Sequence, residues 1–466
     1  MAPQRDTSDD DTAARYAIIG AGPSGLAGAR NLSKLGIRFD GYEAAGEVGG
    51  LWNIDNPRST VYQSAHLISS KTTTEFTEFP MPDGTPDYPN HAQLRRYFAA
   101  FAEHFDLLKH YLFNTEVESV EPEGGKWRVT TSKGSRLYDG VILANGTLAE
   151  PSVPTFAGEF TGEIMHTSQY KSPDVFRGKR VLIIGAGNSG CDIAVDAVHH
   201  AAAIDMSVRR GYYFVPRYLF GKPADTLNQG RPLPARIKQF VDSRVLKVFT
   251  GDPVRFGFPK PDYKIYESHP IVNTLVLHHL GQGDLQVMAD VDRFDGKTVH
   301  FRDGSASDYD LIVLATGYKL NYPFIDRKHL SWTGMAPKLF LNMFGISAVG
   351  TSTAGADAGA HAFNGVYVLG MIEASGIGWQ GRYEQAELLA HYLAASADVR
   401  AQFEAEAAKP WPDLTGGYKF LALERMSYYV NKDAYRGVVK RYIKTLRQAQ
   451  GPLPEPVEGR TTEDHE

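Results

Sequence analysis

The sequence predicts an α/β protein built from two Rossmann-like domains, one of which is inserted within the other. Two internal repeats predict this architecture. A Gly-x-Gly-x-x-Gly segment occurs at residues 20–25 and again at 185–190. Further along, Tyr-Asp followed by an apolar run and a final glycine occurs at 138–146 and again at 309–317. We therefore expect each half to contain a strand, a glycine loop, a helix, further strands and a last buried strand.

Each glycine segment lies between a short apolar run and a stretch of small residues. The apolar runs 16–19 and 181–184 predict strands, and the small residues that follow predict helices. Glycines in such a turn let the backbone approach a pyrophosphate, which the free N–H groups of the helix N-terminus face. The sequence therefore predicts two dinucleotide sites. The candidate binding residues are Gly20, Gly22, Pro23, Ser24 and Gly25 in the first loop, and Gly185, Gly187, Asn188, Ser189 and Gly190 in the second.

The residues at the end of the next strand differ in charge between the two halves. The first half carries Glu43 there, and the second half carries Arg209 and Arg210. A carboxylate accepts hydrogen bonds from a ribose diol, whereas a guanidinium binds a 2′-phosphate. We therefore expect one dinucleotide without a ribose phosphate and one with it.

The repeats also predict the domain boundaries. Residues 15–155 and 318–448 form the first domain, and residues 156–317 form the second, which is inserted at two proline-rich crossings. Residues 211–284 are rich in proline and aromatic residues without a clear period, so an irregular insertion is expected there. The polar ends, residues 1–14 and 449–466, are expected to be disordered.

Composition excludes several classes of protein. The net charge of −5 does not suggest a nucleic-acid partner. The single cysteine, Cys191, rules out an intrachain disulfide, a Cys-x-x-Cys redox pair and a cysteine-based metal site. No apolar run is long enough to cross a membrane and no apolar leader is present, so a cytoplasmic protein without a bound metal is expected.

A segment between the domains carries a family resemblance. Phe160, Gly162, His166 and Tyr170 have the Phe-x-Gly-x-x-x-His-x-x-x-Tyr spacing that resembles the fingerprint of the flavin-containing monooxygenases and related N-hydroxylases. The resemblance includes Gly-Gly-Leu-Trp at 49–52 and Ala-Thr-Gly-Tyr at 315–318. Because Tyr-Lys ends the fingerprint, in place of Trp-Pro or Trp-Asp, the chain is less similar to the Baeyer–Villiger monooxygenases.

The resemblance implies a glutathione-reductase-like FAD domain with an inserted NADP domain. FAD would occupy the first loop and NADPH the second, with O₂ and a small organic molecule as reactants. It further implies that NADPH reduces FAD, and that a flavin C4a-hydroperoxide transfers one oxygen atom to an amine or a sulfide. A homodimer is possible. The further residues implied at the cofactors are Gly50, Leu51, Trp52, Val117 and Thr316.

The catalytic candidates follow from the same resemblance. Tyr62 and Gln380 are expected near the bound NADP⁺, and His66, Ile68 and Ser69 near the flavin. The family usually carries an asparagine at the position of Ile68, and isoleucine cannot donate a hydrogen bond. His66 or Ser69 would have to take over that role. His166 lies on the linker, so domain coupling fits it better than proton transfer.

Other functions stay open at this stage. Because Ile68 stands where the family usually has an asparagine, a Baeyer–Villiger oxidation of ketones is a stronger alternative than is usual for the family. An NADPH oxidase or reductase without oxygen transfer, and a flavin-binding protein without activity, are further alternatives. A flavoprotein disulfide reductase shares the two-dinucleotide plan, but it needs a cysteine pair that this chain lacks.

Overall fold

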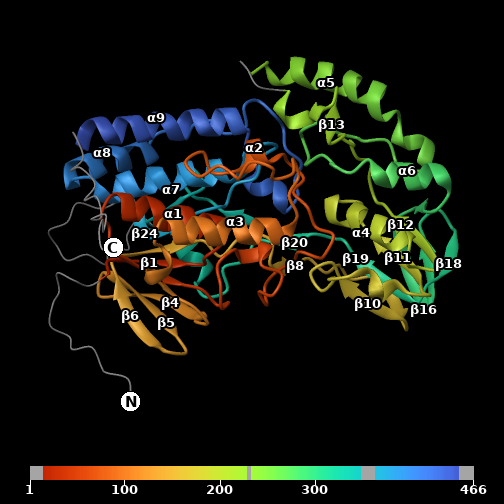
Figure 1. Cartoon of the computed structure of the whole chain (residues 1–466), viewed down its shortest axis with the longest axis horizontal. Coiled ribbons are helices and arrows are strands. Elements are labelled where there is room, and N and C mark those ends of the chain that lie inside the picture. Colours follow the sequence, from red (N-terminus) through yellow and green to blue (C-terminus); the bar gives the residue numbers. More distant parts are fainter. Residues whose placement is uncertain (1–13, 228–231, 348–362, 451–466) are drawn as a thin grey trace, which may run out of the picture.

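The computed structural model describes residues 14–227, 232–347 and 363–450, which form two lobes side by side (Figure 1). Each lobe contains one large, mainly parallel sheet. Of the polar ends that were expected to be disordered, 1–14 and 449–466, only residues 14, 449 and 450 are among the described residues.

The first large sheet has the strand order β23-β24-β7-β1-β2-β3. All neighbours pair in parallel except β23 and β24, which are antiparallel. Strands β1 and β7 are buried along their whole length, as expected for short apolar runs covered on both faces. The strands are β1 (Tyr16–Ile19), β2 (Phe39–Tyr42), β3 (Tyr111–Leu112), β7 (Gly140–Leu143), β23 (Phe344–Ile346) and β24 (Phe363–Val368).

The second large sheet has the strand order β10-β19-β11-β12-β15 and is entirely parallel. Its repeated strand β19 lies beside β11, just as β7 lies beside β1 in the first sheet. The internal repeat is therefore a repeat of structure. The strands are β10 (Glu163–His166), β11 (Arg180–Ile184), β12 (Ala203–Ser207), β15 (Gln286–Met288) and β19 (Leu311–Leu314).

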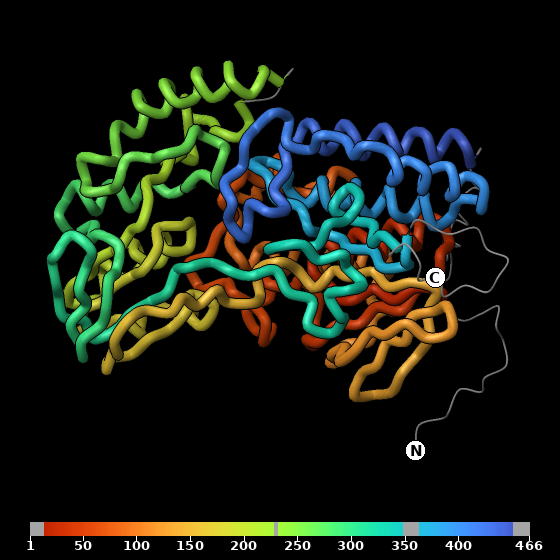
Figure 2. The backbone as a smooth tube through the Cα atoms, turned by 180° about the vertical axis from the view of Figure 1, so that it is seen from behind, coloured from red at the N-terminus to blue at the C-terminus, as the bar shows by residue number. Residues whose placement is uncertain are grey.

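The chain crosses between the lobes at two neighbouring segments. Strand β8 (Glu150–Pro151) pairs in antiparallel fashion with β20 (Tyr318–Lys319). Figure 2 shows these outgoing and returning segments side by side. After β20 the chain returns to the first sheet through β23 and β24, so the second sheet is nested within the first half.

Smaller sheets flank each large one. A three-stranded antiparallel meander belongs to the first lobe, and a four-stranded sheet belongs to the second. The strands are β4 (Val117–Glu123), β5 (Lys126–Thr131) and β6 (Gly134–Tyr138), and then β9 (Ala157–Phe160), β16 (Val291–Gly296), β17 (Thr298–Phe301) and β18 (Ala306–Asp308). Strands β21 (Trp332–Thr333) and β22 (Ala336–Pro337) form a short hairpin.

Helices cover the first sheet in layers. Helix α7 packs between α1 and α9, and most of its residues are buried, in keeping with its central place. The Asn90 side chain caps α3 by accepting a hydrogen bond from Gln93 N. The helices are α1 (Pro23–Lys34), α2 (Lys71–Thr74), α3 (His91–His104), α4 (Asn188–Val198) in the second lobe, α7 (Gly378–Ala394), α8 (Ala397–Ala407) and α9 (Lys432–Gln450).

Residues 211–284 are more regular than the sequence predicts. They contain helices α5 (Ala235–Thr250) and α6 (Leu275–Gln282) and the hairpin of β13 (Tyr218–Leu219) with β14 (Lys222–Pro223). The expectation of an irregular insertion is wrong here. Only Gln239 and Leu246 of α5 are buried, while its exposed side carries several apolar residues. Because apolar residues occur around most of the helix, the usual helical pattern is hidden.

Candidate active site

One large cavity, about 980 Å³ in volume, lies where the two halves meet. Both predicted loops reach it, the first through Gly20 and Gly22 and the second through Asn188 and Ser189. Predicted residues that line it are Gly20, Gly22, Pro23, Ser24, Glu43, Gly50, Leu51, Trp52, Tyr62, His66, Ile68, Ser69, Val117, Asn188 and Ser189.

The two glycine loops have the same close packing. A Cβ atom on Gly20 would lie 2.5 Å from Ala144 O, and one on Gly185 would lie 2.5 Å from Ala315 O. Each first glycine also has a positive φ, +109° for Gly20 and +107° for Gly185. Only glycine fits at either position, so each loop is pressed against the end of its repeated strand.

The Glu43 carboxylate lies at the edge of the first loop. It is buried and accepts hydrogen bonds from Ala21 N at 2.7 Å and from Ala45 N at 2.9 Å. Burial raises its pKa, although the two N–H donors oppose this effect. The carboxylate also lines the cavity, where a ribose diol can donate to it. This loop therefore has the donors and the acceptor that an FAD-type dinucleotide requires.

The Gly49-Gly50 pair approaches the loop itself. Gly49 N donates to Ala21 O at 3.0 Å, and a Cβ atom on Gly50 would lie 2.9 Å from Gly22 Cα. The Trp52 indole packs edge-on against Trp379, with ring centroids 6.2 Å apart, and also borders the cavity. The two glycines thus allow the backbone at 49–50 to lie directly against the backbone of the first loop.

The second loop is tied to the insertion through Asn188. Its Nδ2 donates to Pro270 O, and its Oδ1 accepts from Val272 N at 2.7 Å. Beyond β12, Arg209 is exposed and the Arg210 guanidinium lies 5.5 Å from the Tyr212 ring centroid. Neither arginine lines the cavity, so the contact of these two residues with a ribose phosphate stays a prediction.

The linker residues lie outside the cavity, and their hydrogen bonds stay within the second lobe. His166 is buried, and its Nε2 lies 3.1 Å from Gly317 O on the returning segment. Burial lowers its pKa. Tyr170 is fully buried and donates to Asp196 on α4 at 2.7 Å. Phe160 packs in the core of the second lobe, and a Cβ atom on Gly162 would meet the Phe160 ring.

Helix α4 contacts the first lobe through two carboxylates. Asp192 accepts from Tyr62 OH at 3.1 Å and from Asn273 Nδ2 at 2.5 Å. Asp196 accepts from Ser64 Oγ as well as from Tyr170. Tyr62 therefore connects the segment beside the cavity to the helix that begins at the second loop.

The flavin-side candidates lie together. His66, Ile68 and Ser69 all line the cavity. The His66 Nδ1 lies 2.8 Å from Ser64 O, and the Ser69 hydroxyl lies 2.7 Å from the Thr74 hydroxyl. These contacts engage the Ser69 hydroxyl and one of the two ring nitrogens of His66, the side chains that were expected to compensate for Ile68.

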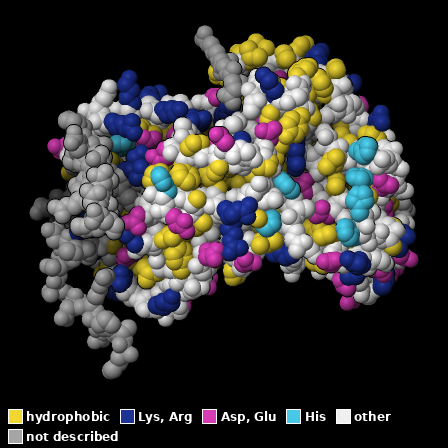
Figure 3. Space-filling view, in the orientation of Figure 1, with side chains coloured by type: hydrophobic (Ala, Val, Ile, Leu, Met, Phe, Trp, Pro, Cys, Tyr) yellow, Lys and Arg dark blue, Asp and Glu magenta, His cyan; other side chains and the backbone are white. Residues whose placement is uncertain are grey.

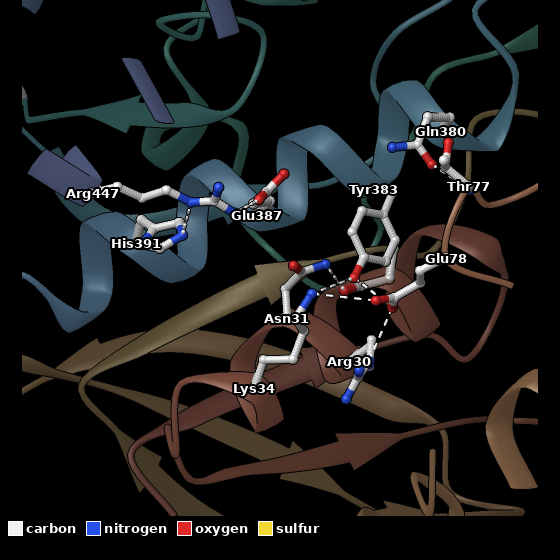
Figure 4. A network of polar contacts seen from close by, with 11 residues as sticks. Arg30, Asn31, Lys34, Thr77, Glu78, Gln380, Tyr383, Glu387, His391 and Arg447 are labelled. Carbon is white, nitrogen blue, oxygen red and sulfur yellow. Dashed lines mark hydrogen bonds and ion pairs between the residues drawn. The ribbon is translucent and has the colours of Figure 1, made fainter. Parts of the chain in front are cut away.

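Gln380 and Thr316 are not among the residues that line the cavity. Gln380 Oε1 accepts from Thr77 N at 2.8 Å, beside the Glu78 network with Arg30, Lys34 and Tyr383 (Figure 4). A catalytic role for Gln380 does not fit this placement. Thr316 donates to Ser152 O at 2.6 Å and ties the two crossings together.

The cavity also contains residues that the sequence did not single out. The insertion contributes Arg217, Asp225, Lys238, Asp242 and Tyr266, and the segment before α9 contributes Tyr418, Phe420 and Arg425. The aromatic richness of residues 211–284 was the available signal. Among the described residues, no group of three or more His, Cys, Asp or Glu side chains could hold a metal ion. Within the same ranges, no helix is long and apolar enough to cross a membrane.

The fold and this cavity define a class of protein, in which two nested Rossmann-like domains face a shared cavity. Residues 13–353 match the family described as Flavin-binding monooxygenase-like. The chain belongs to this family.

Known flavin-containing monooxygenases are similar in sequence to this chain. Flavin-containing monooxygenase 5 of Oryctolagus cuniculus is 33% identical over 346 residues, which cover 67% of this chain and 63% of that protein. Flavin-containing monooxygenase 2 of Homo sapiens is 33% identical over 341 residues, with the same coverage. The chain thus spans a little under two thirds of the length of these relatives.

Solved structures share the fold. S-allyl-L-cysteine S-oxygenase from Allium sativum has a TM-score of 0.62 and 19% identity, covering 92% of this chain and 88% of its own. Cyclohexanone monooxygenase from Rhodococcus sp. Phi1, bound to NADP⁺, has a TM-score of 0.65 and 18% identity, covering 93% and 96%.

Proposed function

We propose that this chain is an FAD- and NADPH-dependent monooxygenase that transfers one oxygen atom from O₂ to a soft nucleophile, an amine nitrogen or a sulfide sulfur. The observation that carries the proposal is the single cavity that both glycine loops reach. Membership of the flavin-binding monooxygenase-like family supports it. Bound FAD would supply the redox chemistry, because no protein side chain can carry a hydride or activate O₂ in this way.

The chain's own residues would bind and orient the cofactors. Glu43 would accept hydrogen bonds from the FAD ribose, and the N-terminus of α1 would face its pyrophosphate. Asn188 and Ser189 begin α4 and would do the same for NADPH. Arg209 and Arg210 would bind the 2′-phosphate.

The cavity wall would protect the reaction from water. Ile68, Trp52 and Val61 line the cavity that the first loop reaches, so apolar side chains would form part of the wall around the flavin. A site of this kind strengthens electrostatic interactions and prevents wasteful loss of reducing equivalents. No protein nucleophile is required.

The test is the ratio of product formed to NADPH consumed, measured over a small panel of amines, sulfides and ketones. The proposal is supported if the amount of oxygenated amine or sulfide is close to the amount of NADPH consumed. If all NADPH consumed is recovered as H₂O₂ with every compound, the chain is an oxidase and the monooxygenase proposal fails.

The ketone members of the panel test a second function. Ile68 in the cavity wall provides no hydrogen-bond donor where the family usually has an asparagine, and this favours a Baeyer–Villiger oxidation as the alternative. Ester or lactone formation without N- or S-oxidation would establish that function instead.

A homodimer also stays a proposal. The outer side of α5 exposes Phe240 and Val248, which are 58% and 81% accessible, and such apolar surfaces are common at protein interfaces. Sedimentation velocity of the purified protein tests this point. A single monomer peak at micromolar concentration would exclude a stable dimer.

A further inference from the structure

Lys171 follows the linker fingerprint directly, and it forms hydrogen bonds to the first lobe. Its Nζ donates to Ser59 O at 2.8 Å and to Val61 O at 3.0 Å. Its backbone oxygen accepts a third hydrogen bond, from Gln63 N at 2.9 Å. The side chain and the backbone of one residue in the second lobe therefore hold a single short stretch of the first lobe, residues 59–63.

The Lys171 ammonium has neutral acceptors, and among the described residues it forms no ion pair with a carboxylate. The side chain is half-buried, and burial lowers its pKa. A buried ammonium is costly unless acceptors compensate for the water that it loses. Here two backbone carbonyls compensate, and a hydrogen bond from a charged donor is about twice as strong as one from a neutral donor. Lys171 thus fixes a backbone path, whereas an ion pair would fix another side chain.

The stretch that Lys171 holds has little other structure. Residues 59–62 belong to no helix or strand. Ser59 and Val61 are only 4% and 6% accessible, so their carbonyl groups need partners inside the protein. Within the described part of the chain, the Lys171 ammonium is the one hydrogen-bond donor to both carbonyl oxygens. Without this ammonium, two buried carbonyls would lose their partner and the stretch would lose the contact that sets its path.

The cavity wall continues directly from this stretch. Residues 60–62 and 65–69 all line the cavity, whereas Lys171 does not. The stretch is also connected to the segment beside the first loop, because Ser59 Oγ donates to Leu51 O at 2.6 Å. Lys171 therefore holds the wall from behind, near the point where the wall leaves that segment.

We infer that Lys171 is a positioning residue for the oxygen-transfer reaction, because it holds residues 59–63 and so keeps the wall segment, residues 59–69, closed to water. This inference rests on the proposed function. The reaction needs a dry cavity, since otherwise NADPH, O₂ and a proton yield NADP⁺ and H₂O₂ without oxygenated product. A wall segment with so little regular structure stays in place only while its backbone contacts hold. Lys171 supplies such a contact from the second lobe.

Hydrogen exchange of the FAD-loaded protein tests this positioning without any turnover. Lys171→Met keeps a long side chain and removes all of its N–H donors. Amides in residues 59–69 should then exchange about tenfold faster or more, as the loss of two charge-assisted hydrogen bonds implies. Lys171→Arg keeps the charge and the donors, so it should restore most of the slow exchange. Lys171→Gln keeps an N–H₂ group without the charge and should give an intermediate rate, which replaces the Met variant if that protein folds poorly.

Two control variants separate this role from a general loss of stability. Lys179→Met makes the same change at a lysine whose Nζ donates to Glu163 at 2.7 Å, within the second lobe. Lys247→Met changes an exposed lysine of α5. This helix lies at the opposite end of the second lobe from β10 (Figure 1), where hydrophobic side chains gather over it (Figure 3). Neither control should alter exchange in residues 59–69, and an equal increase in the controls would overturn the inference.

The consumption of NADPH provides a second readout. With thioanisole as the sulfide, the ratio of sulfoxide to H₂O₂ should fall at least about threefold in Lys171→Met. Lys171→Arg should recover most of this ratio, and Lys179→Met should leave it nearly unchanged. A ratio that stays the same in Lys171→Met, or that falls equally in Lys179→Met, would show that Lys171 does not position the wall for the reaction.

The two readouts also separate this inference from the proposed function. If thioanisole is oxygenated but exchange in residues 59–69 is the same in Lys171→Met and in the unmodified protein, only the role of Lys171 is wrong. If no amine, sulfide or ketone is oxygenated, the proposed function fails. Faster exchange confined to Lys171→Met would in that case still support its hold on the wall segment.

Discussion

Ile68 brings a branched hydrocarbon side chain to the cavity wall at a position where the family resemblance implies an asparagine. The two polar neighbours do not replace that group freely, because Ser69 contacts Thr74 and the His66 ring contacts a backbone carbonyl. An oxygenating flavin enzyme needs its oxygen-transferring group held until substrate arrives. The missing hydrogen-bond donor therefore predicts that part of the NADPH consumed yields H₂O₂ in place of oxygenated product.

Ile68→Asn should reduce this loss. A carboxamide supplies the missing donor, and one hydrogen bond corresponds to roughly a two- to tenfold change in the balance between product and H₂O₂. The measurement is H₂O₂ released per NADPH consumed with a sulfide substrate. Ile68→Leu, which adds no donor, is the control. An unchanged ratio in the Asn variant would show that this position does not govern coupling.

Arg209 and Arg210 should determine which nicotinamide cofactor is used. Changing both to Ala removes the charge-assisted hydrogen bonds expected for a 2′-phosphate, so the KM for NADPH should rise roughly 10- to 100-fold. The KM for NADH should change little, because NADH has no such phosphate. Steady-state kinetics with both cofactors provides the measurement, and an equal rise for both would refute the assignment.

His269 should make stability depend on pH. Burial of the ring, reinforced by the charge of Arg425, lowers its pKa to about 3, and its Nε2 has no partner among the described residues. In the unfolded chain its pKa is about 6.5. Between these values only the unfolded chain holds the proton, so the free energy of unfolding decreases as the pH falls from about 6.5.

Replacing this ring isolates its contribution. Between pH 7 and pH 5, the protein should lose about 2 kcal/mol more stability than His269→Gln does, if the shift is fully expressed. Urea unfolding at the two pH values measures the difference. Parallel pH dependence in the two proteins would show that His269 titrates normally in the folded state.

At the scale of elements, the insertion supports the short helix beside the flavin-side residues. Asp225 Oδ2 accepts from Ser70 N at 2.7 Å and from Thr73 Oγ1 at 2.6 Å, so it caps α2 from another part of the chain. Helix α2 directly follows Ile68 and Ser69. The insertion thus positions the segment that borders the cavity.

Asp225→Ala should loosen this segment. Loss of the cap should lower stability by about 1 to 2 kcal/mol and increase H₂O₂ release. Asp225→Asn keeps one acceptor oxygen and is the matched control. Thermal unfolding and the coupling ratio are the two readouts. A loss of stability without any change in coupling would show that α2 does not influence the reaction.

The sequence predicted the repeated strands well because their apolar runs are short, fully buried and bounded by glycines. Strands β1 and β11, and their partners β7 and β19, all lie where the internal repeat places them. Helix α5 was missed for a different reason, since its apolar residues, such as Phe240, Leu246 and Val248, occur around most of the helix and form no single stripe. Periodicity reveals a helix only when its apolar residues gather on one face.

At the scale of the whole molecule, the site lies between two halves, and this explains which residues the sequence could identify. The glycine loops and Glu43 belong to local motifs with a fixed spacing, so their place in the cavity was predictable. Lys238, Asp242 and Tyr266 become neighbours only because the loop at Tyr266 folds back onto α5 within the insertion. Gln380 shows the converse, since the resemblance placed it near the bound NADP⁺, but its side chain accepts a hydrogen bond from Thr77 N.

The hydrogen bond between Tyr62 and Asp192 should affect both NADP⁺ binding and the release of H₂O₂, because it joins the two halves. Tyr62→Phe removes the hydroxyl that donates to Asp192 across the interface. Tyr309→Phe is a matched control, because Tyr309 OH donates to Asp205 at 2.7 Å within the second lobe alone. Each change leaves a partly buried carboxylate with one donor fewer, so each should lower stability by about 1 to 3 kcal/mol. Only Tyr62→Phe should also weaken NADP⁺ binding and raise H₂O₂ release, since of these two bonds only the one from Tyr62 joins the first lobe to the helix at the NADP loop. If both variants changed coupling equally, the effect would follow from stability, and the interface would have no specific role.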